Sequence, residues 1–205
     1  MANKDWTGNS NSIYKTLGAS NHTANEREGN DYYATDPIAI DKLLDAVKLP
    51  RIIWECACGE GHLSKRLEDR GKWVMSTDLV DYGYGFGGID FLKTNTLIWD
   101  TERCAIVTNP PYKYAKEFVE HSLKLLKKGD MCCMFLKLTF LEGKARRELF
   151  KSIPPPRQVL VFSERVLCAK NGEFQRMKDG GGSAVAYAWF VWKKGYKGKT
   201  TVEWI

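Results

Sequence analysis

The stretch RIIWECACGEGHLSKRLEDRGKWVMSTD, residues 51–78, joins two apolar runs through a glycine-rich turn and an amphipathic segment. The first run, residues 51–56, predicts a buried strand, and residues 62–70, which end before Gly71, predict a helix. The second run, residues 73–78, predicts another strand. A strand, a helix and a strand in this order form a βαβ unit, which is typical of a parallel sheet.

Apolar and amphipathic segments continue to alternate along the chain. Apolar runs predict further strands at 104–109, 131–138, 158–162 and 184–194, and amphipathic segments predict helices at 114–128 and 142–151. Asp36-Pro37 predicts the start of a helix that precedes the first strand. We therefore expect a single α/β domain over residues 31–205, with a doubly wound, mostly parallel seven-stranded sheet and an antiparallel hairpin at its edge.

Composition limits the class of protein. A chain of 205 residues with 43% apolar and 27% charged residues fits one soluble domain. Residues 1–30 are rich in Asn, Ser, Thr and Gly, which predicts a flexible polar arm. No apolar run is long enough for a membrane span or a signal peptide, so a cytoplasmic protein is expected. The six cysteines include the close pair Cys56/Cys58 and the adjacent pair Cys132/Cys133, and reduced core thiols explain them better than disulfides. The three histidines are scattered, so no metal site is predicted.

Charge is distributed unevenly between the two halves of the chain. Residues 1–112 contain 12 Lys and Arg against 16 Asp and Glu, whereas residues 113–205 contain 19 against 9. A basic half of this kind suits a polyanion such as a nucleic acid. A solvated basic surface without a partner is the alternative.

The turn after the first strand suits a nucleotide ligand. Gly59 and Gly61 allow close approach of the backbone, but Ser64 stands where the dinucleotide fingerprint G-x-G-x-x-G requires its third glycine. Asp78 ends the second strand, where a carboxylate can accept hydrogen bonds from both hydroxyls of a ribose. These residues predict a cofactor that contains a nucleoside, although Asp78 could also be a simple turn residue.

Two further motifs follow. In Asp90-Phe91, a carboxylate that could accept from an exocyclic amine stands beside a ring that could cover a purine. Asn109-Pro110-Pro111-Tyr112 directly ends the strand 104–109, and its two prolines make that turn rigid. A capping asparagine and a stiff turn would explain the tetrapeptide structurally, but its position downstream of the glycine turn favours a functional site.

In this order, the glycine turn, Asp78, Asp90-Phe91 and Asn109–Tyr112 resemble the amino-group methyltransferases of the class I S-adenosylmethionine-dependent superfamily. The closest resemblance is to small adenine-N6 DNA methyltransferases of phages and prophages, and it covers about residues 31–193. The resemblance implies S-adenosylmethionine as cofactor, DNA as partner, a bacterial or phage-infected cell as location, and N6 of adenine as the methylated atom.

The resemblance also implies the site residues. The implied cofactor site consists of Tyr33, Thr35, Glu55, Ala57, Cys58, Gly59, Gly61, Asp78, Asp90 and Phe91, and the implied catalytic residues are Asn109, Pro110, Pro111 and Tyr112. Glu55 would lie near the cofactor ammonium, Asp78 at the ribose and Asp90 at the adenine amine. Asn109 and the Pro110 carbonyl would accept hydrogen bonds from the substrate amine, and Tyr112 would stack on the base.

Substrate contacts are expected in the loop 167–183, where a flexible surface loop is the alternative. The residues concerned are Lys170, Phe174, Arg176 and Lys178. The tetrapeptide is also found in enzymes that methylate adenine N6 or guanine N2 in RNA, or glutamine in proteins, and these activities stay open. A cofactor-binding protein without catalysis is a further alternative, and the sequence leaves the oligomeric state undetermined.

Overall fold

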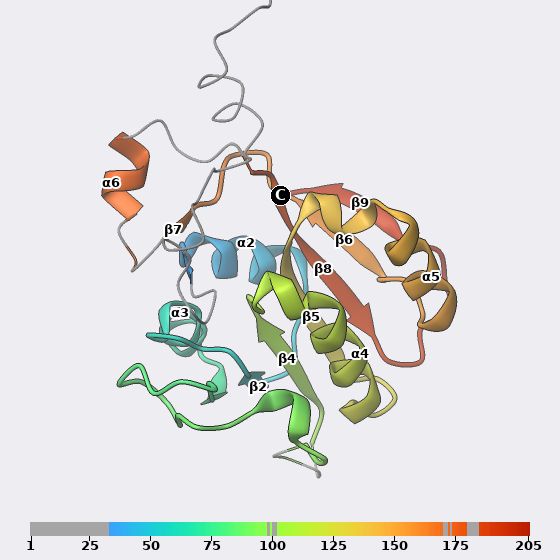
Figure 1. Ribbon diagram of the computed structural model, residues 1–205, viewed down its shortest axis with the longest axis horizontal. Helices are drawn as coiled ribbons and strands as arrows, with labels where there is room; N and C mark the ends of the chain where they lie inside the picture. Colours follow the sequence, from blue (N-terminus) through green and yellow to red (C-terminus); the bar gives the residue numbers. More distant parts are fainter. Residues whose placement is uncertain (1–32, 98, 100–101, 170–171, 173, 180–184) are drawn as a thin grey trace, which may run out of the picture.

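A seven-stranded β-sheet lies at the centre of the computed structural model (Figure 1), which describes residues 33–97, 99, 102–169, 172, 174–179 and 185–205. The order of the strands is β3-β2-β4-β5-β8-β6-β9. They are β2 (Ile52–Glu55), β3 (Trp73–Ser76), β4 (Cys104–Thr108), β5 (Met131–Lys137), β6 (Gln158–Val161), β8 (Tyr187–Lys193) and β9 (Thr201–Trp204). The α/β fold with a seven-stranded sheet is confirmed.

The directions of the strands also agree with the prediction. All neighbouring pairs are parallel except those of β8, which is antiparallel to both β5 and β6. The antiparallel pair of β6 and β8 is thus present, with β8 inserted beside β5. The edge beyond β6 is formed by β9, which the sequence analysis does not identify. Every residue of β9 is exposed, so this strand lacks the apolar run that predicts the others.

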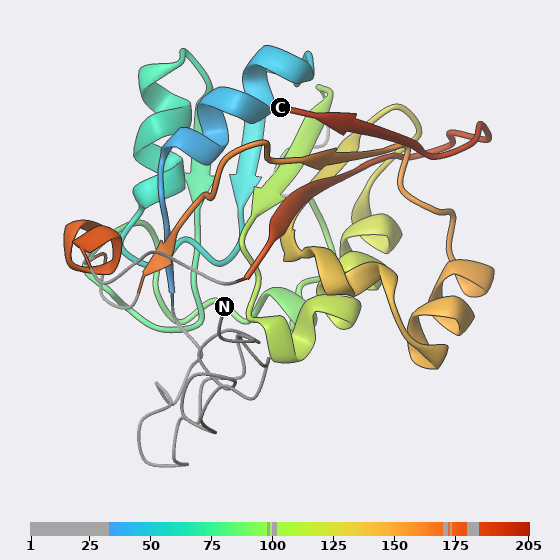
Figure 2. The same ribbon diagram turned by 90° about the horizontal axis from the view of Figure 1, so that it is seen from above.

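Helices cover both faces of the sheet, because its strands are apolar on both sides. On one face lie α2 (Ile38–Ala46) and α3 (His62–Asp69), and on the other lie α4 (Ala115–Leu125) and α5 (Lys144–Ser152), as Figure 2 shows. Alternate strand residues therefore enter different cores: Ile53 packs on the α2 side and Trp54 on the α4 side. Burial of an aliphatic side chain such as that of Ile53 contributes about 1.5–3 kcal/mol.

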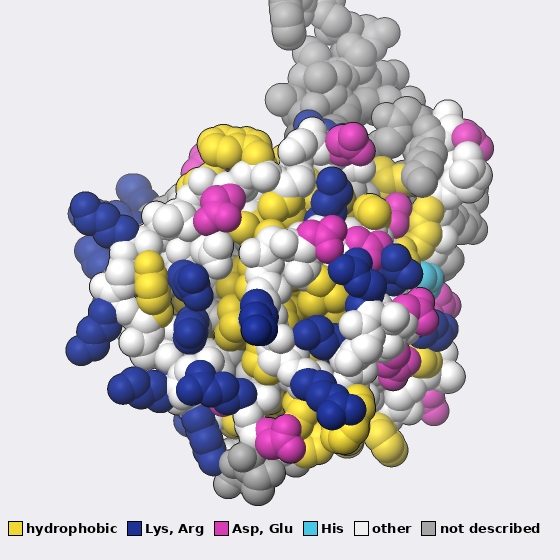
Figure 3. Space-filling model, turned by 180° about the vertical axis from the view of Figure 1, so that it is seen from behind, with side chains coloured by type: hydrophobic (Ala, Val, Ile, Leu, Met, Phe, Trp, Pro, Cys, Tyr) yellow, Lys and Arg dark blue, Asp and Glu magenta, His cyan; other side chains and the backbone are white. Residues whose placement is uncertain are grey.

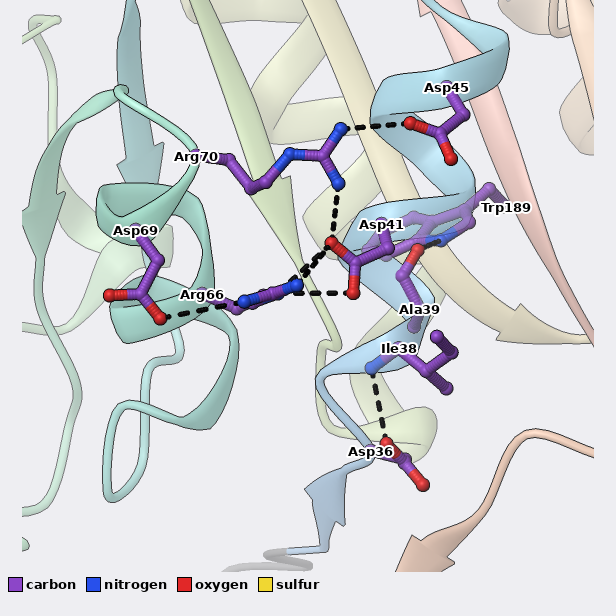
Figure 4. A network of polar contacts seen from close by, with 9 residues as sticks. All are labelled: Asp36, Ile38, Ala39, Asp41, Asp45, Arg66, Asp69, Arg70 and Trp189. Carbon is purple, nitrogen blue, oxygen red and sulfur yellow. Dashed lines mark hydrogen bonds and ion pairs between the residues drawn. The ribbon is translucent and has the colours of Figure 1, made fainter.

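Polar contacts join the first two helices. Helix α2 begins as predicted, since Asp36 Oδ1 accepts a hydrogen bond from the Ile38 N–H at 3.1 Å. Arg66 and Arg70 of the α3 region both donate to the Asp41 carboxylate, at 3.0 and 2.5 Å (Figure 4). Burial alone would raise the pKa of Asp41, but the two guanidinium groups lower it overall. This cluster fixes α3, and the glycine turn at its start, against α2.

A second, two-stranded sheet connects the beginning of the described chain with the region after β6. It pairs β1 (Ala34–Thr35) antiparallel with β7 (Cys168–Ala169), so that Thr35 lies opposite Cys168. The expected loop 167–183 therefore begins as a buried strand, because its first residues belong to an apolar run. The short helices are η1 (Phe91–Lys93), η2 (Tyr112–Tyr114), η3 (Leu138–Leu141) and α6 (Phe174–Asp179). The predicted arm, residues 1–30, lies outside the described residues and stays a prediction.

Candidate active site

A cavity of about 510 Å³ lies at the carboxyl ends of β2 and β4. Its wall contains predicted site residues from several separate segments of the chain. They are Tyr33, Thr35, Glu55, Ala57, Cys58, Asp78, Asp90, Phe91, Asn109, Pro110, Pro111 and Tyr112. Ligands of open α/β sheets bind at this edge. The fold thus brings eight of the ten predicted cofactor residues and all four predicted catalytic residues to one cavity, whereas Gly59 and Gly61 are not among its lining residues.

The turn after β2 depends on two glycines. Gly59 and Gly61 have φ angles of 52° and 79°, in the left-handed region that side chains disfavour. A Cβ atom on Gly61 would also overlap the ring of Tyr84. Asp78 is fixed beside this turn, since its Oδ2 accepts from the Gly59 N–H at 2.8 Å and its Oδ1 from the Val80 N–H at 3.0 Å. Its carboxylate oxygens keep lone pairs for further donors such as ribose hydroxyls.

Glu55 places a carboxyl group at the end of β2 that is only 2% exposed. It accepts a hydrogen bond from Ser64 Oγ, which lies 2.6 Å from Ser76 Oγ. Burial raises the pKa of Glu55 to about 8, although the Ser64 hydrogen bond acts in the opposite direction. A nearby cation favours the charged form of such a group. The chemistry of Glu55 therefore fits an ammonium group in the cavity.

Asp90 and Phe91 differ in their accessibility from the cavity. Asp90 Oδ2 lies 2.9 Å from Lys93 Nζ, and this contact lowers the pKa of Asp90, so the carboxylate is charged at neutral pH. The ring of Phe91 is 2% exposed and packs into the core, where its centroid lies 5.2 Å from that of Trp54. Asp90 is therefore the more accessible of the two predicted adenine contacts.

Asn109 lies where β4 ends, and the two sides of its amide have different surroundings. Its Nδ2 donates to Thr35 Oγ1 at 2.8 Å, to the Tyr33 carbonyl at 3.2 Å and to Cys168 Sγ at 3.4 Å. Its Oδ1 is buried and has no hydrogen-bond partner among the described residues. The contacts of Nδ2 determine the orientation of the amide. They leave a buried, oriented acceptor without a donor on a residue that lines the cavity.

Tyr112 is held by contacts on its ring and on its hydroxyl group. The ring lies 5.9 Å from that of Tyr187 at an interplanar angle of 27°, and Lys137 Nζ lies 4.9 Å from its centroid. The hydroxyl oxygen lies 3.4 Å from Cys168 Sγ. Burial raises the pKa of Tyr112, so the phenol is neutral. The half-buried ring is thus fixed in orientation at the cavity wall.

Cys168 connects the catalytic candidates, and the sequence analysis does not single it out. Its buried sulfur contacts both Asn109 and Tyr112 and lies 4.0 Å from Thr35 Oγ1. Burial raises the pKa of Cys168, so the sulfur stays a neutral thiol. The apolar run 166–169 could have indicated that Cys168 is buried. Its contacts depend on the pairing of β1 with β7, which joins residues far apart in the sequence.

Of the four predicted substrate residues, only Phe174 has a side chain that the structure describes. Phe174 begins α6 and packs edge-on against His62, with the ring centroids 5.6 Å apart, and His62 lines the cavity. Lys170 lies outside the described residues. For Arg176 and Lys178 the structure describes the backbone of α6 and not the side chains. The substrate roles of these four residues stay predictions.

The six cysteines are free and buried, as expected for reduced core residues. Within the described ranges, no group of three His, Cys, Asp or Glu side chains could hold a metal ion. No helix in the same part of the chain is long and apolar enough to cross a membrane.

No protein-family model matches the chain, and no curated protein matches its sequence. Solved structures do match its fold. A Vibrio vulnificus protein described as a modification subunit of a type I restriction enzyme aligns with a TM-score of 0.56 and 12% identity, over 84% of this chain and 46% of its own. For the 23S rRNA methyltransferase ErmE the TM-score is 0.51 and the identity 16%, over 82% of this chain and 72% of its own.

A Listeria monocytogenes protein described as a class I S-adenosylmethionine-dependent methyltransferase aligns with a TM-score of 0.55 and 12% identity. The alignment covers 82% of this chain and 62% of that protein. This chain thus spans less than two thirds of the Vibrio and Listeria proteins. The chain has the fold of the class I S-adenosylmethionine-dependent methyltransferases.

Proposed function

We propose that this protein is an S-adenosylmethionine-dependent methyltransferase that modifies N6 of adenine in DNA. The observation that carries the proposal is the asymmetry of the Asn109 amide. Its NH2 group has three acceptors, whereas its buried oxygen has no donor within the described part of the chain. A buried acceptor without a donor costs about 1–3 kcal/mol. An amine in the cavity would supply the missing donor.

Acceptors at this position suit an amine that is a poor nucleophile. The lone pair of the adenine amine is delocalised into the ring, and it must localise as the nitrogen becomes tetrahedral and positive. Acceptors aimed at the amine hydrogens favour this change and stabilise the developing charge. Asn109 Oδ1 would be one acceptor and the Pro110 carbonyl the other, with its direction restricted by the two prolines. The resulting ammonium is acidic enough to lose its proton to water, so no strong base is required.

The other end of the cavity fits S-adenosylmethionine, which supplies a methyl group activated by its sulfonium. Glu55 would bind the ammonium of the methionine part, because a cation offsets the cost of ionising a buried carboxyl group. Asp78 would bind the ribose hydroxyls, and Asp90 the adenine amine. The sequence analysis places Thr35 at the cofactor. In the structure, Thr35 Oγ1 accepts a hydrogen bond from Asn109 Nδ2 at 2.8 Å. We therefore propose that Thr35 orients Asn109.

The basic character of residues 113–205 supports a nucleic acid as substrate. An adenine amine in a duplex is paired and stacked, so the base must be flipped out or taken from a single strand, and Tyr112 would stack on it. RNA is the second candidate, because one of the structures with this fold is an rRNA methyltransferase. The acceptors of the Asn109 region would suit an amine in either polymer.

The test is methyl transfer from S-adenosylmethionine with a tritiated methyl group. Unmethylated DNA, bulk RNA and a protein extract are offered separately, and the labelled product is digested to identify the modified base or residue. N6-methyladenine in DNA is the expected product. Label in RNA or protein alone would contradict DNA as the substrate. Tight binding of the cofactor without label in any polymer would contradict the assignment as an enzyme.

A further inference from the structure

A second hollow lies at the opposite edge of the sheet, where β4, β5 and β6 begin and β8 ends. Its volume is about 660 Å³, and cations dominate the residues that line it. They are Arg103, Lys128, Arg157, Lys193, Lys194 and Lys197. Figure 3 shows Lys and Arg side chains gathered on this side of the molecule, at the left of the view. We call this hollow the basic groove; no acidic residue is among its described lining residues.

Two Lys-Lys-Gly turns, residues 127–129 and 193–195, form the floor of the basic groove. They are joined by a hydrogen bond from the Gly129 N–H to the Lys194 carbonyl at 2.9 Å. The φ angles of Gly129 and Gly195 are 98° and 84°, which side chains disfavour. A Cβ on Gly129 would overlap the Arg103 guanidinium, and one on Gly195 would approach the Lys128 side chain to 3.0 Å. The glycines therefore allow these two cations to lie across the turns.

The positive charge of the basic groove is not neutralised within the described chain, where no ion pair involves its six cations. The nearby carboxylates are engaged otherwise. Asp130 is buried and accepts from two backbone N–H groups, and Glu203 accepts from Gln158 Nε2 at 3.0 Å. Lys194 Nζ donates to the Leu123 carbonyl, and Arg157 lies 5.7 Å from the centroid of the Tyr196 ring and is attracted by Glu203. This leaves Arg103, Lys128, Lys193 and Lys197 for a ligand. Like charges collected in one hollow create a strong attraction for a polyanion.

We propose that the basic groove binds the phosphodiester backbone of a nucleic acid, at a distance from the nucleotide that is modified. The choice of a nucleic acid over an acidic protein rests on the proposed function. The five residues of β4 separate this groove from the cavity, and at ~3.3 Å per residue they span about 16 Å. A phosphate in the groove therefore lies several nucleotides from the target base. Such contacts add affinity and position the polymer, without reading its sequence.

The test compares two double variants with the same change in charge. Lys128→Gln/Lys197→Gln removes two exposed cations of the basic groove, and Lys42→Gln/Lys48→Gln removes two lysines at α2. Binding of a fluorescein-labelled 30-base-pair DNA duplex is measured by anisotropy at several salt concentrations, with methyl transfer measured in parallel. For the groove variant, the negative slope of the logarithm of the binding constant against the logarithm of the salt concentration should become shallower by about 1.8. Affinity at 0.1 M salt should fall by roughly 10- to 60-fold. The control variant should stay within about twofold of the original protein in affinity.

Other outcomes would overturn the inference. Equal loss of affinity in both double variants, or none in the groove variant, would show that the groove makes no specific contact with DNA, even if methyl transfer persists. A polyglutamate peptide could bind the original protein as tightly as the duplex does, and its affinity could fall equally in the groove variant. This result would assign the groove to acidic proteins. Loss of DNA binding in the groove variant alone, with no methyl transfer by the original protein, would support the groove and contradict the proposed function.

Discussion

The two ends of the cavity are built in different ways. The end at Glu55 and Asp78 comes from one βαβ unit, and its polar contacts join residues close in the sequence, such as Gly59 to Asp78. The end at Asn109 is assembled from β1, β4 and β7, with hydrogen bonds across 74 and 59 positions of the chain to Thr35 and Cys168. The first end is formed by local chain geometry, whereas the second depends on the whole fold.

The two ends also differ in how their polar atoms are satisfied. Asp78 accepts hydrogen bonds on both carboxylate oxygens, and Glu55 accepts from Ser64. Asn109 uses its NH2 group fully but leaves its oxygen without a donor among the described residues. The carboxylates of a cofactor site can accept hydrogen bonds from the protein and still bind a ligand. An oxygen that has to accept from a substrate amine, by contrast, must have no donor from the protein.

The largest effect is expected for Asn109→Ala, which removes the free acceptor and leaves the glycine turn intact. Loss of one oriented group that stabilises charge in a transition state lowers kcat by about 10²–10³. Methyl transfer should fall by this factor, while cofactor affinity, measured by calorimetry, changes less than about threefold. Asn95→Ala, at an exposed asparagine, is the control. Full activity in Asn109→Ala would refute the proposed role of the amide.

The difference between the two ends also explains how far the sequence predicts this molecule. Strands with continuous apolar runs, such as 131–137, were predictable, and so was the turn that contains Gly59, because both are local. The residues of Asn109–Tyr112 could be chosen from their type and position. Their support by Cys168 and the pairing of β1 with β7 could not, because two-residue strands carry no periodic pattern and meet only in the folded chain. Strand β9 was not predicted for a related reason: all of its residues are exposed, so it has no apolar run.

The second prediction concerns Glu55 and the free energy of unfolding. Its pKa is about 8 in the folded protein and about 4.5 when unfolded, so the folded state holds the extra proton between these values. Stability is therefore lost as the pH rises from 4.5 to 8, by roughly 1.4 kcal/mol per pH unit. Glu55→Gln cannot ionise, and without cofactor it should be roughly 3 kcal/mol more stable than the original protein at pH 7.

Urea unfolding at pH 5, 6.5 and 8 measures this difference. The advantage of Glu55→Gln should grow with pH, and Glu142→Gln, at an exposed glutamate, should show no such growth. The same variant should bind S-adenosylmethionine more weakly, because it lacks the charge that would hold the ammonium. A stability difference that does not depend on pH would show that Glu55 is ionised in the folded protein.

A smaller effect is expected at Thr35, where two roles compete. Thr35→Val removes the acceptor for Asn109 Nδ2, and the loss of one hydrogen bond to the amide should lower kcat roughly tenfold. Cofactor affinity should not change. Thr35→Ser keeps the hydroxyl and should stay within about threefold of the original activity. If Thr35 instead binds the cofactor, Thr35→Val will weaken cofactor binding and leave kcat unchanged at saturation.

The smallest effect is expected for Tyr112→Phe, which removes a hydroxyl that lies 3.4 Å from Cys168 Sγ and also interacts with the Tyr187 side chain. Sulfur is a weak hydrogen-bond partner, so kcat/KM for DNA should change less than about threefold. Tyr112→Leu should be much worse, because base stacking on an aromatic ring contributes about 1–3 kcal/mol. The comparison of the two variants separates the ring from the hydroxyl. Equal losses in both would show that Tyr112 acts through its hydroxyl, by its contacts with Cys168 and Tyr187, more than through stacking on the base.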